Sequence, residues 1–316
     1  MKYLVTGGAG FIGSHIVDEL IRNNHQVVVI DNFSTGKEIF VSHHRHDPNF
    51  RLIKGDVLDK KLLTQTMKNI DFVFHLAAHA DVRNGYTNHS VDHRQNLETT
   101  LSVLEAMFKN KVNKIAFTST SSVYGDASVH PTPETYPFEP TSLYGATKAA
   151  CESYIRAYAG YYDWQAYIFR LVSFIGERYT HGIIFDLIKK IADKPDKLTL
   201  FSDGSPKKSS LYVKDGVSAF FQVINKAKQQ INIYNVGHEE IFTIDEIVNI
   251  ILTVLKCRLP KSYLGGKRGW AGDNNFVHLD ISKLKSLGWK PKKSLKEAVK
   301  LTIDYLLNQP ELFRGK

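Results

Sequence analysis

Thr6-Gly7-Gly8-Ala9-Gly10-Phe11-Ile12-Gly13-Ser14 follows an apolar run at residues 2–6 and precedes a helical pattern that continues to about residue 22. Glycines at this spacing allow a tight turn, a close approach of the backbone to a diphosphate and close packing of the helix on the strand. The helix N-terminus attracts anionic phosphate. Because the loop lies between a predicted strand and a predicted helix, it indicates a dinucleotide-binding unit.

A second apolar strand is predicted at residues 26–30, and Asp31 follows it, eighteen residues beyond Gly13. A carboxylate at this position can bind both hydroxyls of an adenosine ribose and would repel a 2′-phosphate. Asp31 therefore favours NAD over NADP, although Lys37 could soften that preference.

Predicted strands and helices alternate through the first half of the chain. The further strands are at 51–54, 71–76, 114–119 and 165–171, and the helices are at 59–68, 90–108 and 144–163. This alternation predicts an α/β fold with a Rossmann-like, doubly wound parallel sheet. Asp56 could accept from an adenine amino group, and Ala77 and Ala78 leave room for a dinucleotide. Without the glycine-rich loop, turn chemistry and close packing would explain these three residues.

The pattern changes beyond Gly176, where short elements are separated by glycine, proline and asparagine. The predicted elements are helices at 182–192, 214–227, 244–255 and 294–307 and strands at 198–201 and 211–213. No repeat, low-complexity tract or flexible linker divides the chain. We expect an NAD-binding domain with the catalytic residues at 1–176. Residues 177–316 should form a smaller, interleaved and mainly substrate-binding subdomain, with some segments returning to the sheet.

Tyr144 and Lys148 are four residues apart on a predicted helix, so both side chains lie on one face. A phenol with a pKa of about 10 is a poor base at neutral pH, but a neighbouring cation lowers that pKa. A bare YxxxK spacing usually marks a surface pair on an amphipathic helix. Here the glycine-rich loop, Asp31 and the run at 118–122 favour a catalytic pair.

The composition is that of a globular protein, with 43% hydrophobic and 23% charged residues among 316. No apolar run approaches the roughly 20 residues of a membrane span, and the N-terminus lacks a signal-peptide pattern. We therefore expect a cytoplasmic protein with no membrane partner. The net charge of +9 comes from scattered lysines, so an anionic small substrate explains it better than a nucleic acid. Cys151 and Cys257 have neither metal-ligand nor disulfide spacing, and no metal is expected.

Six motifs occur in order in the first half of the chain: TGGAGFIGS at 6–14, DNFSTG at 31–36, GDV at 55–57, HLAA at 75–78, TSTSSVYG at 118–125 and YGATK at 144–148. Together they resemble the extended short-chain dehydrogenase/reductases. Within that superfamily the chain is most similar to the NAD-dependent nucleotide-sugar epimerase/dehydratase group, and in particular to archaeal-type UDP-glucose 4-epimerases. The similarity continues in THGI at 180–183, DG at 203–204, YVKD at 212–215, YNVG at 234–237 and RGWAGD at 268–273.

The resemblance implies a reaction and roles for three residues. In such enzymes bound NAD removes hydride from the hexose C4 while a tyrosine takes the hydroxyl proton, and the 4-keto intermediate turns and receives the hydride on its other face. Tyr144 would be this tyrosine, and Lys148 would keep the phenol acidic and contact the nicotinamide ribose. Thr120 would share the hydrogen-bond path to the sugar.

The resemblance also implies two sets of contacts. The cofactor set is Gly7, Gly10, Phe11, Ile12, Gly13, Asp31, Asn32, Ser34, Thr35, Gly36, Asp56, Val57, Leu76, Ala77, Ala78, Asn96, Thr118, Tyr144 and Lys148. The substrate set is His79, Arg83, Ser121, Ser122, Ser173, His181, Gly182, Ile183, Lys208, Arg268 and Asp273. For His79, a polar lining of the cofactor pocket is an equally good interpretation.

Several departures from the family pattern bear on the reaction. Ser121 and Ser122 stand where dehydratases carry an Asp-Glu pair, and hydroxyls cannot replace that acid and base, so 4,6-dehydration is disfavoured. Ser173 replaces a usual asparagine. Lys208 replaces a usual diphosphate-binding arginine and supplies charge without a bidentate fork. We expect Arg268 to reach the diphosphate, and the small Val277 to admit either a hydroxyl or an N-acetyl group at the sugar C2.

The sequence therefore predicts an NAD-dependent 4-epimerase of UDP-hexoses, acting on glucose/galactose, N-acetyl or uronic acid forms. Oxidative decarboxylation of UDP-glucuronate is an alternative, for which Arg83 or Ser121 could be recruited. A non-catalytic NAD-binding scaffold is a third interpretation, against which the intact catalytic residues argue. Helices 90–108 and 144–163 form a dimer interface in the resembled family, so we expect a homodimer. The apolar pattern of helix 90–108 fits burial against the protein's own sheet equally well.

Overall fold

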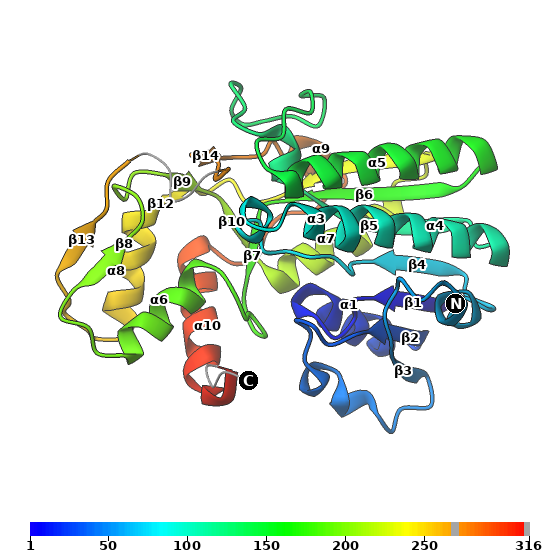
Figure 1. Ribbon diagram of the computed structural model, residues 1–316, viewed down its shortest axis with the longest axis horizontal. Coiled ribbons are helices and arrows are strands. Elements are labelled where there is room, and N and C mark those ends of the chain that lie inside the picture. Colours follow the sequence, from blue (N-terminus) through cyan, green and yellow to red (C-terminus); the bar gives the residue numbers. More distant parts are fainter. Residues whose placement is uncertain (267–271, 313–316) are drawn as a thin grey trace.

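A seven-stranded parallel sheet forms the centre of the computed structural model, which describes residues 1–266 and 272–312 (Figure 1). The strand order is β11-β6-β5-β4-β1-β2-β3, so the chain changes its winding direction between β1 and β4. The strands are β1 Lys2–Thr6, β2 Gln26–Asp31, β3 Phe50–Lys54, β4 Phe72–His75, β5 Lys114–Thr120, β6 Gln165–Leu171 and β11 Ile231–Val236. The predicted fold class is confirmed, and β11 is an additional edge strand that the sequence analysis did not predict.

Helices cover both faces of this sheet. On one face α1, Phe11–Arg22, contacts α7, Val213–Lys226. On the other face α4, Thr99–Asn110, lies between α2, Lys60–Thr66, and α5, Leu143–Tyr162 (Figure 1). Alternate residues of each strand enter two separate cores, as Val5 and Leu4 of β1 do. Because both faces are buried, the central strands are almost continuously apolar.

The helix predicted at 90–108 is broken, which corrects the sequence analysis. A short α3, His89–Asp92, leads into a π-helical turn, His93–Glu98, before α4 begins. The wider turn coincides with Asn96, whose buried side chain bonds to the backbone of a neighbouring loop. Hydrophobic periodicity could not show this irregularity, since it reports the exposed and buried faces but not the hydrogen-bond pattern.

Most of the remaining elements lie beyond the carboxyl ends of the strands, at the left of Figure 1, but residues 282–285 pack against β11 at the edge of the sheet. The helices are α6 Ile183–Ala192, α8 Ile244–Val254, α9 Ser282–Lys285 and α10 Leu295–Leu307. Small sheets pair β7 Ser173–Ile175 with β10 Ser210–Tyr212, β8 Leu198–Leu200 with β13 Lys261–Tyr263, and β9 Lys207–Lys208 with both β12 Phe242–Thr243 and β14 Phe276–Val277. Capping boxes begin α8 and α10. In the described part of the chain, none of the helices combines the length and apolarity of a membrane span.

Candidate active site

The glycine-rich loop joins β1 to α1 at the carboxyl edge of the sheet, beside the end of β4. Gly7 has a φ of 70°, and a Cβ there would lie 2.7 Å from the amide nitrogen of Ala77. A Cβ on Gly13 would lie 2.3 Å from the carbonyl oxygen of Gly7. Gly10 precedes α1 without a side-chain cap, so the first amides of Phe11 and Ile12 are left for another acceptor. The geometry fits a bound diphosphate.

Asp31 ends β2 directly beneath this loop. It is buried, with Oδ2 accepting from the amide of Ala9 at 2.9 Å and Oδ1 from the amide of Phe33 at 2.8 Å. Burial raises the pKa of Asp31, and these amide bonds oppose the rise. Each carboxylate oxygen can still accept from a ribose hydroxyl. Gly36 lies so close that a Cβ on it would be 2.8 Å from Asp31 Oδ1.

The other predicted cofactor residues also lie at this edge of the sheet. Asn32 donates to Asp56 at 3.1 Å and accepts from the amide of Ser34 at 2.9 Å. Ser34 and Thr35 are exposed, whereas Val57 is buried. After β4, Leu76, Ala77 and Ala78 are half-buried, and the first two donate backbone amides to the Thr6 hydroxyl. These loops therefore lie next to one another along the carboxyl edge of the sheet.

His75, at the end of β4, supports this edge from within. Its Nδ1 lies 2.8 Å from Thr6 Oγ1, and its Nε2 lies 3.0 Å from Thr100 Oγ1. Burial lowers the pKa of His75 to about 3, with a smaller contribution from Lys148. The ring is therefore neutral at neutral pH and has a structural role.

Thr120, Tyr144 and Lys148 come together where β5 meets the first turn of α5. Thr120 caps the 3₁₀ turn Ser121–Tyr124 by accepting from the amide of Ser122 at 3.1 Å, and its side chain hydrogen bonds to Tyr144. The ammonium of Lys148 donates to the carbonyl of Thr118 at 2.9 Å. It lies 5.9 Å from the centre of the Tyr144 ring. The tyrosine, the threonine and the lysine thus surround one point at the carboxyl edge of the sheet.

Contrary to the expectation from its spacing to Lys148, the surroundings of Tyr144 within the chain raise the pKa of its phenol. Burial raises the pKa of the phenol, the negative charge of Asp92 raises it further, and only the hydrogen bond from Thr120 lowers it. Burial also lowers the pKa of Lys148 to about 8, so its ammonium loses a proton more readily than that of an ordinary lysine. The spacing of the two residues indicates attraction between phenolate and ammonium, but the desolvation of both groups is the larger effect here.

His79 belongs to a polar network that the sequence analysis did not predict. Its Nδ1 lies 3.1 Å from Oδ1 of the fully buried Asp92, and its amide donates to Asn96 Oδ1 at 2.8 Å. Asn96 also reaches the Thr147 hydroxyl, at 3.3 Å, and so joins the network to α5. The sequence does hold one sign of this network. Asp92 and Asn96 are four residues apart, and residues at that spacing share a helix face.

A buried ion pair next to Thr120 was also missed by the sequence-based prediction. Arg170 of β6 donates to Glu152 of α5, with Nη2 2.8 Å from Oε2 and Nε 3.1 Å from Oε1. Ser119 donates to the same carboxylate, and Arg170 Nη1 donates to the Tyr124 hydroxyl at 2.8 Å. The network ties β5, β6 and α5 together immediately next to Thr120.

The predicted substrate residues fall into separate groups. Lys208 pairs with Asp273, with 2.8 Å between Nζ and Oδ1, and also donates to the carbonyl of Asn274. Arg83 is half-exposed, and its contacts are Asp81 at 3.2 Å and Asp186 of α6 at 3.5 Å.

The other substrate candidates lie on connecting segments. Ser121 and Ser122 are half-buried beside Thr120, and Ser173 is exposed at the start of β7. His181 is exposed just before Gly182, which has a φ of 96° and precedes Ile183, the first residue of α6. Arg268 lies outside the described residues, so its expected diphosphate contact has no structural account.

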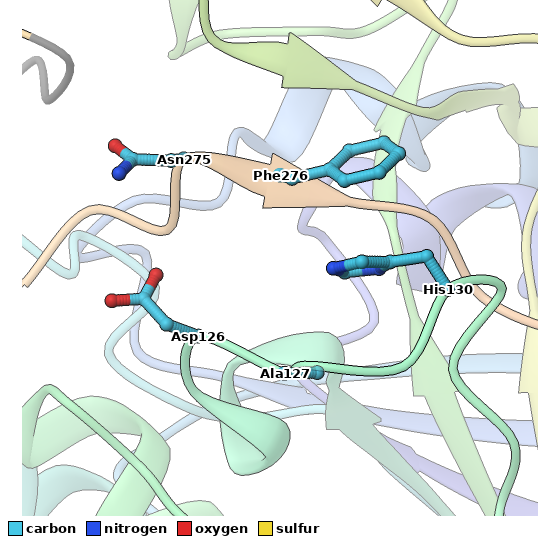
Figure 2. Close-up of a pocket in the computed structure, with 5 residues that line it drawn as sticks. All are labelled: Asp126, Ala127, His130, Asn275 and Phe276. Atoms are coloured by element: carbon cyan, nitrogen blue, oxygen red, sulfur yellow. The ribbon is translucent and has the colours of Figure 1, made fainter.

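A pocket of about 330 Å³ opens beyond the Ser121–Tyr124 turn. Figure 2 shows its lining residues, which are Asp126, Ala127, His130, Asn275 and Phe276. The rings of His130 and Phe276 lie 4.1 Å apart between their centres. The pocket lies between the loop that follows the Ser121–Tyr124 turn and the start of β14, and Tyr144 and Lys148 do not line it.

Comparison with known proteins agrees with this geometry. A model of the NAD dependent epimerase/dehydratase family matches residues 3–237. The chain belongs to this family. A Methanocaldococcus jannaschii protein provisionally named UDP-glucose 4-epimerase is 34% identical over 311 residues, covering 96% of this chain and 98% of that protein.

Two further relatives show the range of reactions among the family members similar to this chain. A solved UDP-glucuronic acid 4-epimerase from Bacillus cereus, in complex with UDP-glucuronic acid and NAD, has a TM-score of 0.90 and 30% identity, covering 98% of this chain and 99% of that one. UDP-glucuronic acid decarboxylase 1 of Arabidopsis thaliana is 31% identical, covering 98% of this chain and 72% of that protein.

Proposed function

We propose that this chain is an NAD-dependent 4-epimerase of UDP-sugars. The observation that carries the proposal is the convergence of Thr120, Tyr144 and Lys148 at the same edge of the sheet as the glycine-rich loop, with serines at 121 and 122 in place of carboxyl groups. Similarity to 4-epimerases over nearly the whole chain supports the same reaction. A dehydratase would need an acid and a base where this chain has only hydroxyls.

NAD would lie along the carboxyl edge of the sheet. The glycine-rich loop and the N-terminus of α1 would hold its diphosphate, and Asp31 would bind the adenosine ribose. Lys148 would bind the nicotinamide ribose, and the small residues Ala77 and Ala78 leave space beside it. When bound, NAD supplies the hydride acceptor and a positively charged ring near the phenol.

Tyr144 would take the proton of the sugar C4 hydroxyl, with Thr120 in the same hydrogen-bond path. Because burial raises the pKa of Tyr144 in this structure, the phenol depends on nearby positive charge to act as a base. Lys148 supplies one such charge when it is protonated. Return of the proton from Tyr144 completes the reaction, so the residues end in the state in which they began.

UDP-glucuronate decarboxylation is the second candidate, because a decarboxylase is among the relatives. That reaction begins with the same oxidation and needs a group that holds the sugar carboxylate. Arg83, one candidate, is half-exposed and forms ion pairs with Asp81 and Asp186. Ser121, the other candidate, is half-buried beside Thr120.

The proposed reaction is tested by Tyr144→Phe, with Tyr161→Phe as a control on the exposed side of the same helix. We expect Tyr144→Phe to lower epimerase turnover by about 10²–10⁴-fold, because general acid–base catalysis contributes that much. NAD content and melting temperature should remain unchanged, and Tyr161→Phe should retain full turnover. Full turnover in Tyr144→Phe would contradict the assignment.

We also propose that two copies associate through α4 and α5. Leu104 is buried against the protein's own sheet, but Phe108 and Tyr154 are 52% and 45% exposed on these two helices. Large exposed aromatic side chains are typical of interfaces. Sedimentation of a monomer at micromolar concentration would contradict the dimer.

A cytoplasmic location is proposed as well. Both cysteines, Cys151 and Cys257, are free thiols, which fits a reducing compartment.

A further inference from the structure

A cluster of metal-binding side chains lies between α1 and the 3₁₀ turn Ser42–His44. Asp18 comes from α1, and His43 and His44 come from the turn. Within residues 1–266 and 272–312, this is the one group of three or more His, Cys, Asp or Glu side chains whose donor atoms all lie within 4.8 Å of one another. Cysteine spacing, on which the expectation of no metal rested, carries no information about this cluster.

The three donor atoms converge on a small volume. Nε2 of His43 lies 3.0 Å from Asp18 Oδ1, and Nε2 of His44 lies 2.7 Å from the same oxygen. Zn²⁺ binds imidazole nitrogen and carboxylate oxygen at about 2.0–2.2 Å, which places neighbouring ligand atoms a little over 3 Å apart. Small side-chain rotations would therefore open the cluster around one ion.

Asp18 is held in place by a second partner, Arg178. Arg178 Nη2 contacts Oδ2 at 2.8 Å, whereas both histidines face Oδ1. A second partner on the distal oxygen is usual for a ligating carboxylate, because it fixes the orientation of the group.

We propose that Asp18, His43 and His44 bind one divalent transition-metal ion, with Zn²⁺ as the probe. Imidazole and carboxylate ligands suit Zn²⁺ and its neighbours in the first row. The side chain of His43 is 48% exposed, so water can complete the coordination. Such an ion would fasten residues 42–44 to α1, the helix that begins at the glycine-rich loop. The site is independent of the proposed epimerisation.

The proposal is tested by equilibrium dialysis of the full chain, without an affinity tag, against Zn²⁺ at neutral pH. We expect one Zn²⁺ per chain, and a visible Co²⁺ spectrum after substitution with Co²⁺. His43→Ala and His44→Ala should each weaken Zn²⁺ binding at least about tenfold, since even outer-shell changes weaken metal sites by 10–100-fold. Zn²⁺ should raise the melting temperature of the wild type but not of these variants.

Two controls keep the result interpretable. His89→Ala, at an exposed histidine outside the cluster, should bind Zn²⁺ as the wild type does. Because His43 is largely exposed, His43→Ala should fold normally, which its melting curve without metal will verify. Absence of stoichiometric Zn²⁺ binding by the wild type would overturn the proposal, as would undiminished binding by both His43→Ala and His44→Ala.

Discussion

Replacing Lys148 with methionine should stabilise the nucleotide-free protein at neutral pH, although Lys148 belongs to the proposed active site. The side chain is 3% exposed, and burial lowers its pKa to about 8 from an ordinary value of 10.5. Its ammonium donates to the Thr118 carbonyl at 2.9 Å and lies 4.6 Å from the centre of the Phe117 ring. Among the described residues, no carboxylate forms a salt bridge with it. The charge is therefore buried with little compensation.

The size of the effect follows from the pKa of Lys148. Its lowering from 10.5 to about 8 corresponds to about 3 kcal/mol of unfolding free energy at pH 7. Between these two values the unfolded chain binds more protons than the folded chain, so wild-type stability rises with pH through this window. Methionine has a similar length but leaves the Thr118 carbonyl unpaired. The lost hydrogen bond lowers the free energy of unfolding by about 1 kcal/mol. We expect a net gain of about 2 kcal/mol at pH 7.

Urea unfolding of the two proteins, freed of bound nucleotide, measures this difference. The advantage of Lys148→Met should be largest near pH 7 and should vanish as the pH approaches 10.5, while its epimerase activity is lost. Lys109→Met, at an exposed lysine of α4, should change stability by less than about 0.5 kcal/mol at either pH. A Lys148→Met protein that is less stable than wild type at pH 7, with no dependence of the difference on pH, would refute the reasoning.

Three further predictions concern the supports of the site. Arg170→Met should lower the free energy of unfolding by about 3–5 kcal/mol in urea, because it leaves the buried Glu152 carboxylate unpaired. The exposed-pair control Arg45→Met should lower it by less than 1 kcal/mol, and equal effects of the two variants would contradict the burial argument. Gly13→Ala should abolish NAD binding in a calorimetric titration, since its Cβ would lie 2.3 Å from a carbonyl oxygen of the loop, and retained affinity would argue against a bound diphosphate there. Acid should destabilise the protein through His75, because burial lowers its pKa to about 3 and only the unfolded chain takes up the proton below pH 6.5. The loss should be about 2 kcal/mol by pH 5, and His75→Gln should remove most of this slope.

Local patterns were enough to predict the architecture. The glycine-rich loop, the acidic residue that ends β2 and the alternation of apolar strands with amphipathic helices are all short-range features, and each survives in the structure. The closeness of Tyr144 and Lys148 follows from the geometry of a single helix. These features could be read from the sequence because each depends on residues a few positions apart.

Features that depend on distant residues could not be predicted. The partner of Arg170 is Glu152, which lies on a different element. Only the packing of α5 against β6 brings the two side chains together. The pKa of Tyr144 depends on how deeply the fold buries it, which no spacing reports. Asp18 meets His43 and His44 because the turn after β2 folds back onto α1. In each case the tertiary contact decides the chemistry of the residue.

The central claim is tested most directly by proton NMR of the purified protein incubated with UDP-glucose in heavy water, without added cofactor. Parallel incubations use UDP-N-acetylglucosamine and UDP-glucuronate. We predict that at least one of these sugars is converted to its 4-epimer with no deuterium on carbon 4, because the hydride leaves and returns through bound NAD. Three results would contradict the account. All three sugars could fail to give a 4-epimer, the 4-epimer could carry deuterium at carbon 4, or UDP-glucuronate could give a UDP-pentose while no 4-epimer forms.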